Sequence, residues 1–160
     1  MHRLICCLVL TTAPFSFAAT PLFRASFEIH DPGWSAVRGS ASLDASVVHA
    51  GNKSLRVEAA ASGTSTDACI QFAPVSLTIG KHYELSGWAR TDHLSVRDLD
   101  RSPIASGAAL SMASMPFDVH SAALGGTTAW TRLSLKFVAS RASDQILLNV
   151  GNGGAFQGKA

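Results

Sequence analysis

The chain has little of what several common protein classes depend on. Its 160 residues include three cysteines, three tryptophans and one tyrosine, and its 13 lysines and arginines are scattered along the sequence. Because no run of basic residues occurs, neither a nucleic acid nor an anionic membrane surface is an expected partner. No stretch repeats apolar residues at helical spacing, so a helical bundle is not expected. Alanine, serine and glycine are abundant, which favours thin strands and many turns.

The N-terminal segment has the layout of a secretory signal peptide. A short basic start precedes an apolar run over residues 4–10, and small residues near position 18 suit a cleavage site. We therefore predict a signal peptide at 1–18, a mature domain at 20–160, and a secreted or periplasmic location. A membrane anchor is the alternative, but the run is too short to span a bilayer and Pro14 interrupts its continuation. No membrane span is expected after cleavage.

After such a cleavage a single cysteine, Cys69, would remain. One thiol cannot form an internal disulfide, so stability must come from packing or from a bound ion. Cys69 lies in an apolar run and is interpreted as a small buried hydrophobe rather than a reactive thiol.

Period-two alternation dominates the rest of the chain. Strands are predicted at 23–27, 37–43, 54–58, 69–77, 83–90, 108–115, 133–137 and 146–150. The polar segments 62–67 and 92–103 are predicted to be loops. Many short strands separated by turn signals indicate an all-β sandwich or barrel in a single domain.

Five segments, in a fixed order, carry a family resemblance. They are Ser26–Glu28, Pro32–Trp34, His49–Val57, Tyr83–Thr91 and Thr127–Leu133. Their order and spacing resemble carbohydrate-binding module families 4 and 9. The resemblance implies a jelly-roll β-sandwich of the galactose-binding-domain-like type. It also implies a non-catalytic module that binds a polysaccharide or a cell-wall glycan and is commonly appended to a secreted hydrolase.

The C-terminal region departs from that family pattern. Chains of this kind usually close with a strand of the type Gly-x-Ala-Trp-Phe-Asp-Asp-Val, and this sequence stops at Ala160, where such a strand would begin. We therefore expect the C-terminal strand to be missing and one neighbouring strand edge to be unpaired. A truncated product or a fragment of a longer hydrolase fits this expectation.

The charged segment 92–120 suggests an alternative function. It is longer than the generic module needs, and it is similar to inserts in modules that precede bacterial peptidase domains, zinc carboxypeptidases included. On this interpretation the chain is an N-terminal accessory domain of a secreted peptidase with no role in sugar binding.

Sugar binding needs flat aromatic surfaces and a few polar groups, because the CH face of a pyranose stacks on a ring while its hydroxyls take hydrogen bonds. The predicted ligand-binding residues are Trp88, Arg90, Glu84 and Phe117. The first three share the outer face of the strand 83–90, and the fourth lies in a loop. The alternative is that the loop 92–103 covers the tryptophan. Trp34 and Trp130 follow turn signals and are interpreted mainly as plugs at the ends of the sandwich.

The family resemblance also implies a structural calcium ion. Glu28 would supply a carboxylate and Lys53 a backbone carbonyl, since calcium takes several oxygen ligands. Glu28 is equally well explained as a solvated strand residue. No histidine pair has a zinc-binding spacing. No Gly-x-Ser-x-Gly elbow occurs, and Asp98 and Asp100 alternate with arginines as in a salt-bridged loop, so no catalytic residues are predicted.

Overall fold

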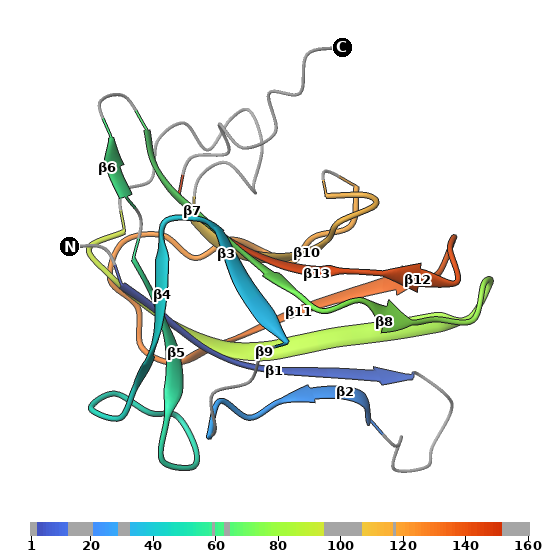
Figure 1. Cartoon of the computed structure of the whole chain (residues 1–160), viewed down its shortest axis with the longest axis horizontal. Coiled ribbons are helices and arrows are strands. Elements are labelled where there is room, and N and C mark those ends of the chain that lie inside the picture. Colours follow the sequence, from blue (N-terminus) through green and yellow to red (C-terminus); the bar gives the residue numbers. More distant parts are fainter. Residues whose placement is uncertain are drawn as a thin grey trace.

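The computed structural model describes residues 3–12, 21–28, 33–58, 60–62, 65–94, 107–116 and 118–151. Every regular element in these ranges is a β-strand. The strands form two antiparallel sheets and a two-stranded ribbon (Figure 1). No helix in this part of the chain is long or apolar enough to cross a membrane. The predicted all-β sandwich is confirmed.

The larger sheet has six strands in the order β11-β9-β1-β5-β4, with β2 also paired to β1. Their bounds are β1 (Arg3–Thr12), β2 (Pro21–Ala25), β4 (Ser40–Asp44), β5 (Ser54–Glu58), β9 (His82–Asp92) and β11 (Thr131–Val138). The longest strand, β9, therefore lies between β11 and β1.

The second sheet has the order β10-β13-β7-β3, with β6 also paired to β7. Its strands are β3 (Trp34–Arg38), β6 (Ala60–Ser62), β7 (Ser65–Phe72), β10 (Gly107–Met112) and β13 (Ile146–Gly151). The ribbon pairs β8 (Val75–Ser76) with β12 (Ser143–Asp144). The segment after β10 folds back on it through a bridge between Ala108 and Leu124, so the free edge of β10 is partly covered.

One buried apolar cluster joins the two sheets. Leu85 and Leu133 contribute from the larger sheet, and Ile70, Leu110 and Leu148 contribute from the smaller one. Strands β9 and β11 alternate buried and exposed residues along their length, as their sequences predict. Each fully buried side chain of this size contributes about 1.5–3 kcal/mol through removal from water. The packing of the two alternating faces is therefore what holds the sandwich together.

Several of the predicted segment boundaries are wrong. The strand predicted at 37–43 is divided at Gly39 between β3 and β4, which lie in different sheets. The segment 62–67 is predicted to be a loop, but β6 ends at Ser62 and β7 begins at Ser65, and the two strands pair as a hairpin. Its residues carry no apolar alternation, so the sequence contains no strand signal there. The strand predicted at 69–77 ends at Phe72, because Pro74 has no N–H to donate to a ladder.

The part of the predicted signal segment that the structure describes, residues 3–12, lies inside the larger sheet. Residues 3–12 form β1, which pairs with β9 on one side and with β5 and β2 on the other. Removal of the segment by a signal peptidase stays a prediction. Figure 1 shows β1 in dark blue, running alongside β9.

Gly39 joins the two sheets at a crowded point. It links β3 in the smaller sheet to β4 in the larger one, with a φ of 72°. A Cβ at this position would lie 2.5 Å from Cβ of Ala68 and 2.6 Å from the carbonyl oxygen of Glu58. Only glycine accommodates both the left-handed backbone and this close approach.

Candidate functional site

Three aromatic rings from separate segments meet beside β9 of the larger sheet. Trp88 belongs to β9, His49 to the loop 45–53 between β4 and β5, and Trp130 directly precedes β11. The His49 ring stacks on Trp88, with 4.4 Å between centroids and 16° between planes. It also meets Trp130 edge-on at 5.2 Å and 65°. We call these three residues the aromatic cluster.

An open pocket of about 390 Å³ adjoins this cluster. It is lined by Arg24, Ala25, Ser26, Glu28, His49, Ala50, Gly51 and Trp88. Its volume falls in the lower part of the range for small-ligand sites, roughly 300–1,000 Å³. Trp88 retains 37% of its surface exposed, although the His49 ring covers one face of its indole. The pocket therefore combines an aromatic surface with a cation, a carboxylate and a hydroxyl group.

Glu28 shapes one wall of the pocket through its contacts with the turn 51–53. Its Oε1 accepts a hydrogen bond from the backbone N–H of Asn52 at 2.8 Å, and its Oε2 accepts one from the Asn52 side-chain amide at 3.2 Å. The backbone N–H of Asn52 is the main cause that lowers the pKa of Glu28, so the carboxylate stays ionised. Gly51 has a φ of 76°, a left-handed backbone that favours glycine, and a Cβ there would lie 2.0 Å from Oε1.

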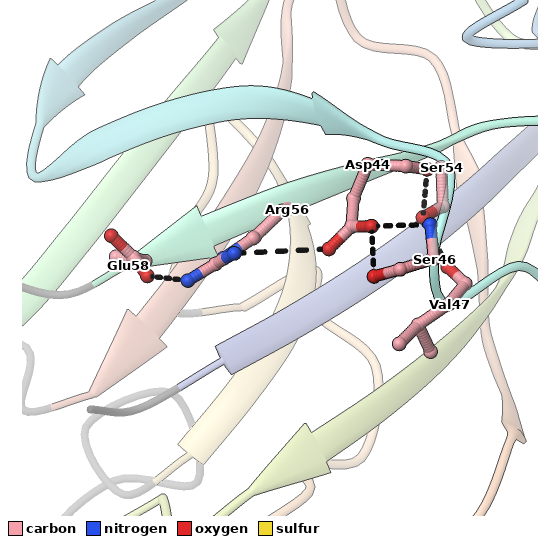
Figure 2. A network of polar contacts seen from close by, with 6 residues as sticks. All are labelled: Asp44, Ser46, Val47, Ser54, Arg56 and Glu58. Atoms are coloured by element: carbon pink, nitrogen blue, oxygen red, sulfur yellow. Dashed lines mark hydrogen bonds and ion pairs between the residues drawn. The ribbon is translucent and has the colours of Figure 1, made fainter.

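A polar network fixes the base of the loop that carries His49 (Figure 2). Oδ1 of Asp44 accepts hydrogen bonds from the backbone N–H and the hydroxyl of Ser46, at 2.7 and 2.6 Å. The Ser46 hydroxyl is the main cause that lowers the pKa of Asp44. The hydroxyl of Ser54 donates to the carbonyl of Val47 at 2.6 Å, which ties the two ends of the loop together.

Arg56 extends this network along β5. Its guanidinium lies 3.9 Å from the Asp44 carboxylate and makes a closer ion pair with Glu58. All three side chains are at least partly buried, with 8% of Asp44, 26% of Arg56 and 33% of Glu58 exposed. The loop that carries His49 thus has a charged base, held by hydrogen bonds and ion pairs where the loop leaves β4 and enters β5.

The ligand residues predicted on β9 share its outer face. Trp88 and Arg90 are exposed and Glu84 is partly buried, and they alternate with buried residues such as Leu85 and Ala89. The structure separates them, however. Glu84 accepts a hydrogen bond from Arg132 of β11 at 3.0 Å, whereas Trp88 faces His49 and the pocket. Trp88 therefore belongs to the pocket, and Glu84 belongs to an ion pair farther along the same face.

The other predicted site residues have mixed outcomes. Phe117 and most of the loop 92–103 lie outside the described residues, so the predicted covering of Trp88 by this loop is not tested. Glu28 lines the pocket, and Lys53 follows Asn52 in the turn that Glu28 holds. Within the described ranges no group of three or more His, Cys, Asp or Glu side chains gathers to hold a metal ion. The predicted calcium site at Glu28 and Lys53 stays a prediction.

Sequence reasoning missed His49, Arg24 and the place of Trp130. His49 lies within a segment that carries the family resemblance, but the sequence indicates no role for its ring beyond an unsupported zinc site. Trp130 is predicted mainly as an end plug, and the structure places its ring in the aromatic cluster. Arg24 is an exposed residue of β2 between Phe23 and Ala25, and this alternation predicts only a solvated strand residue. All three reach the pocket or its rim through pairings between distant segments.

Two facing antiparallel sheets carry an open, aromatic-lined pocket of a kind that can bind a small ligand. A model of the carbohydrate binding domain family CBM_4_9 matches residues 21–153, and the chain belongs to this family. The expected family is thereby confirmed, and with it a non-catalytic carbohydrate-binding module. Searches of curated proteins and of solved structures return no match.

Proposed function

We propose that this chain is an exported module that holds a sugar unit of a polysaccharide or cell-wall glycan in the pocket beside Trp88. The single observation that carries the proposal is the aromatic cluster at the rim of a pocket of about 390 Å³. Trp88 supplies the apolar surface on which the CH face of a pyranose stacks. The stack with His49 fixes the plane of the indole, so little rotamer freedom is lost when a sugar binds.

The polar lining of the pocket matches the other requirement of a sugar. Arg24 carries hydrogen-bond donors, and Glu28 carries acceptor oxygens with a lowered pKa. A pyranose presents hydroxyls at its ring edge, and each hydroxyl can both donate and accept a hydrogen bond. Arg24 and Glu28 therefore suit two adjacent hydroxyls. Exposed Arg90 extends the polar surface along β9 beyond the pocket.

The test is retention of the full chain by a panel of insoluble polysaccharides and cell-wall preparations, followed by calorimetry with the best soluble fragment. Trp88→Ala removes the stacking surface and is expected to weaken binding by roughly tenfold or more. Trp88→Phe keeps an aromatic face and is expected to recover part of the affinity. Ile79→Ala is the matched control, because Ile79 is an exposed apolar residue, 64% accessible, that does not line the pocket.

Two outcomes would contradict this proposal. Equal affinities for wild type, Trp88→Ala and Ile79→Ala would place the ligand elsewhere on the molecule. Absence of retention on every polymer would favour the accessory-domain function, in which the chain contacts a secreted peptidase and no sugar.

Export and partnership with a secreted hydrolase complete the proposal. A module that attaches to a polymer raises the local concentration of a linked enzyme on that polymer, even when its own affinity is modest. Cell fractionation tests export directly, and the expected result is recovery of the protein in the periplasm or the medium. Recovery in the cytoplasm alone would contradict both the proposed export and the proposed hydrolase partner outside the cell.

A further inference from the structure

Strand β1 occupies an interior position in the larger sheet. All ten of its residues pair with β9, from Arg3 opposite Asp92 to Thr12 opposite Tyr83. On its other side, residues 3–6 pair with β5 and residues 8–11 pair with β2. Without β1 these neighbours would face a gap one strand wide. We call this position between β9 on one side and β5 and β2 on the other the β1 slot.

The β1 slot imposes a period of two on its occupant. Even-numbered positions of β1 lie opposite core residues: Leu4 opposite Val57 and Thr91, Cys6 opposite Leu55 and Ala89, Leu8 opposite Gly87 and Ala25, and Leu10 opposite Leu85. Odd-numbered positions lie opposite more accessible residues. Val9, for example, is registered between Ser86 and the exposed Arg24. A strand that fits the slot therefore needs apolar residues at alternate positions.

The charges at one end of the slot also match its occupant. Arg3 is registered between Glu58 of β5 and Asp92 of β9. Opposite charges at paired positions stabilise neighbouring strands, and the register sets this basic position opposite an acidic residue on each side. The basic start and the apolar run from which an export signal is predicted therefore also satisfy the slot.

We propose that Arg3–Thr12 is a segment with two exclusive uses: an export signal while the chain is unfolded, and the interior strand of the larger sheet once an uncut chain folds. Export requires the segment to be accessible, whereas the folded sheet pairs it on both edges. A chain that folds before export hides its own signal. Cleavage removes the occupant and leaves a strand-acceptor site whose ligand is the sequence of Arg3–Thr12 itself.

The two uses respond differently to a charge, and this provides the test. An apolar signal core has no register, so Leu8→Asp and Val9→Asp are expected to reduce export equally. The sheet does have a register. In the purified full chain, Leu8→Asp is expected to lower the midpoint of thermal unfolding by about 10 °C or more, because it places a charge opposite the core. Val9→Asp, opposite Arg24, is expected to lower it by only about 2 °C.

Each half of the proposal can fail separately. Equal melting midpoints for the two variants would contradict the place of β1 in the folded sheet. Undiminished export of both variants would contradict the signal function. Should Leu8→Asp not fold at all, Leu8→Ala against Val9→Ala gives the same contrast with a smaller shift.

Exchange of the strand is measured on the folded full chain. A specific protease site is introduced between Thr12 and Pro21, and the folded protein is cut. The N-terminal peptide is expected to co-elute with the domain, and a labelled synthetic copy of residues 1–12 in excess is expected to replace it. A copy carrying the Leu8→Asp substitution is the matched control and is expected not to enter. Loss of the peptide with an unchanged melting midpoint and a monomeric domain would overturn the acceptor site.

Discussion

The two strands that flank β9 differ in how clearly their own sequences predict a strand. On one side, β11 alternates buried leucines and phenylalanine with exposed polar residues. On the other side, β1 is apolar at every position from Leu4 to Leu10. Both nonetheless pair with β9 over most of its length, through eight residues of β11 and ten of β1. The comparison teaches that a strand in the interior of a sheet is specified by its neighbours, whereas a clear pattern in its own sequence is not required.

The largest expected effect is a loss of free energy of unfolding caused by a charge in β11. Leu135 is 5% exposed and lies opposite the fully buried Leu85. Leu135→Asp would bury an unpaired charge, and we expect the free energy of unfolding to fall by about 4 kcal/mol or more. Ser134→Asp is the control, because Ser134 is exposed one position away and its substitution is expected to cost no more than about 0.5 kcal/mol. Chemical denaturation of the full chain measures both values.

The losses of stability for Leu135→Asp and Ser134→Asp provide a scale for the loss caused by Leu8→Asp in β1. A loss for Leu8→Asp that approaches the loss for Leu135→Asp would make β1 as integral to the core as β11. A loss close to that of Ser134→Asp would mean that β9 depends on β11 alone. Equal effects of Leu135→Asp and Ser134→Asp would contradict the packing of β11 itself.

The same contrast explains how much of the fold was predictable. Strands β5, β9, β11 and β13 have alternating apolar residues, so their side-chain period revealed them. An apolar run without alternation fits a buried strand and a signal peptide equally well, and local pattern cannot separate the two. The polar hairpin of β6 and β7 was missed for the opposite reason, since it carries no apolar signal at its turn.

The candidate site was predictable only where one strand supplied it. The alternation of β9 alone predicts that Trp88 and Arg90 lie on its outer face, and the structure agrees. His49 reaches Trp88 because a loop between β4 and β5 folds across neighbouring strands, and Trp130 joins them because β11 pairs with β9. Such contacts depend on strand order, which the sequence of a single element does not contain.

The next largest effect is the pH-dependent contribution of Asp44, on the β5 side of the sheet, to the free energy of unfolding. The folded-state pKa of Asp44 is below its ordinary value of 3.8, mainly because the Ser46 hydroxyl donates to the carboxylate. The unfolded chain therefore takes up the proton more readily, so the stability from Asp44 is present above about pH 4 and is lost as the pH falls through the folded-state pKa. Asp44→Asn is expected to lower the free energy of unfolding at pH 7 by about 1–2 kcal/mol.

A comparison of pH profiles isolates this group. Denaturation curves between pH 7 and pH 2 are expected to converge for wild type and Asp44→Asn at the acid end, because both then lack the charge. Lys136→Ala, on the β11 side, serves as the control and should leave the difference between pH 7 and pH 2 nearly unchanged. Parallel profiles for wild type and Asp44→Asn would show that this carboxylate contributes nothing to acid sensitivity.

The smallest expected effect compares the two ion pairs of the larger sheet. On the β11 side, Arg132 and Glu84 are 54% and 24% exposed and lie 3.0 Å apart. On the β5 side, Arg56 and Glu58 are 26% and 33% exposed and share the network with Asp44. Water and salt screen the more exposed pair more strongly, so a double-mutant cycle for Arg132→Ala and Glu84→Ala should give a coupling of about 0.5 kcal/mol or less. The Arg56 and Glu58 cycle should give the larger value, and salt at about 1 M should reduce the Arg132 coupling most. A larger coupling energy for Arg132 and Glu84 would mean that the network at the base of the His49 loop stabilises its ion pair no more than an ordinary surface position does.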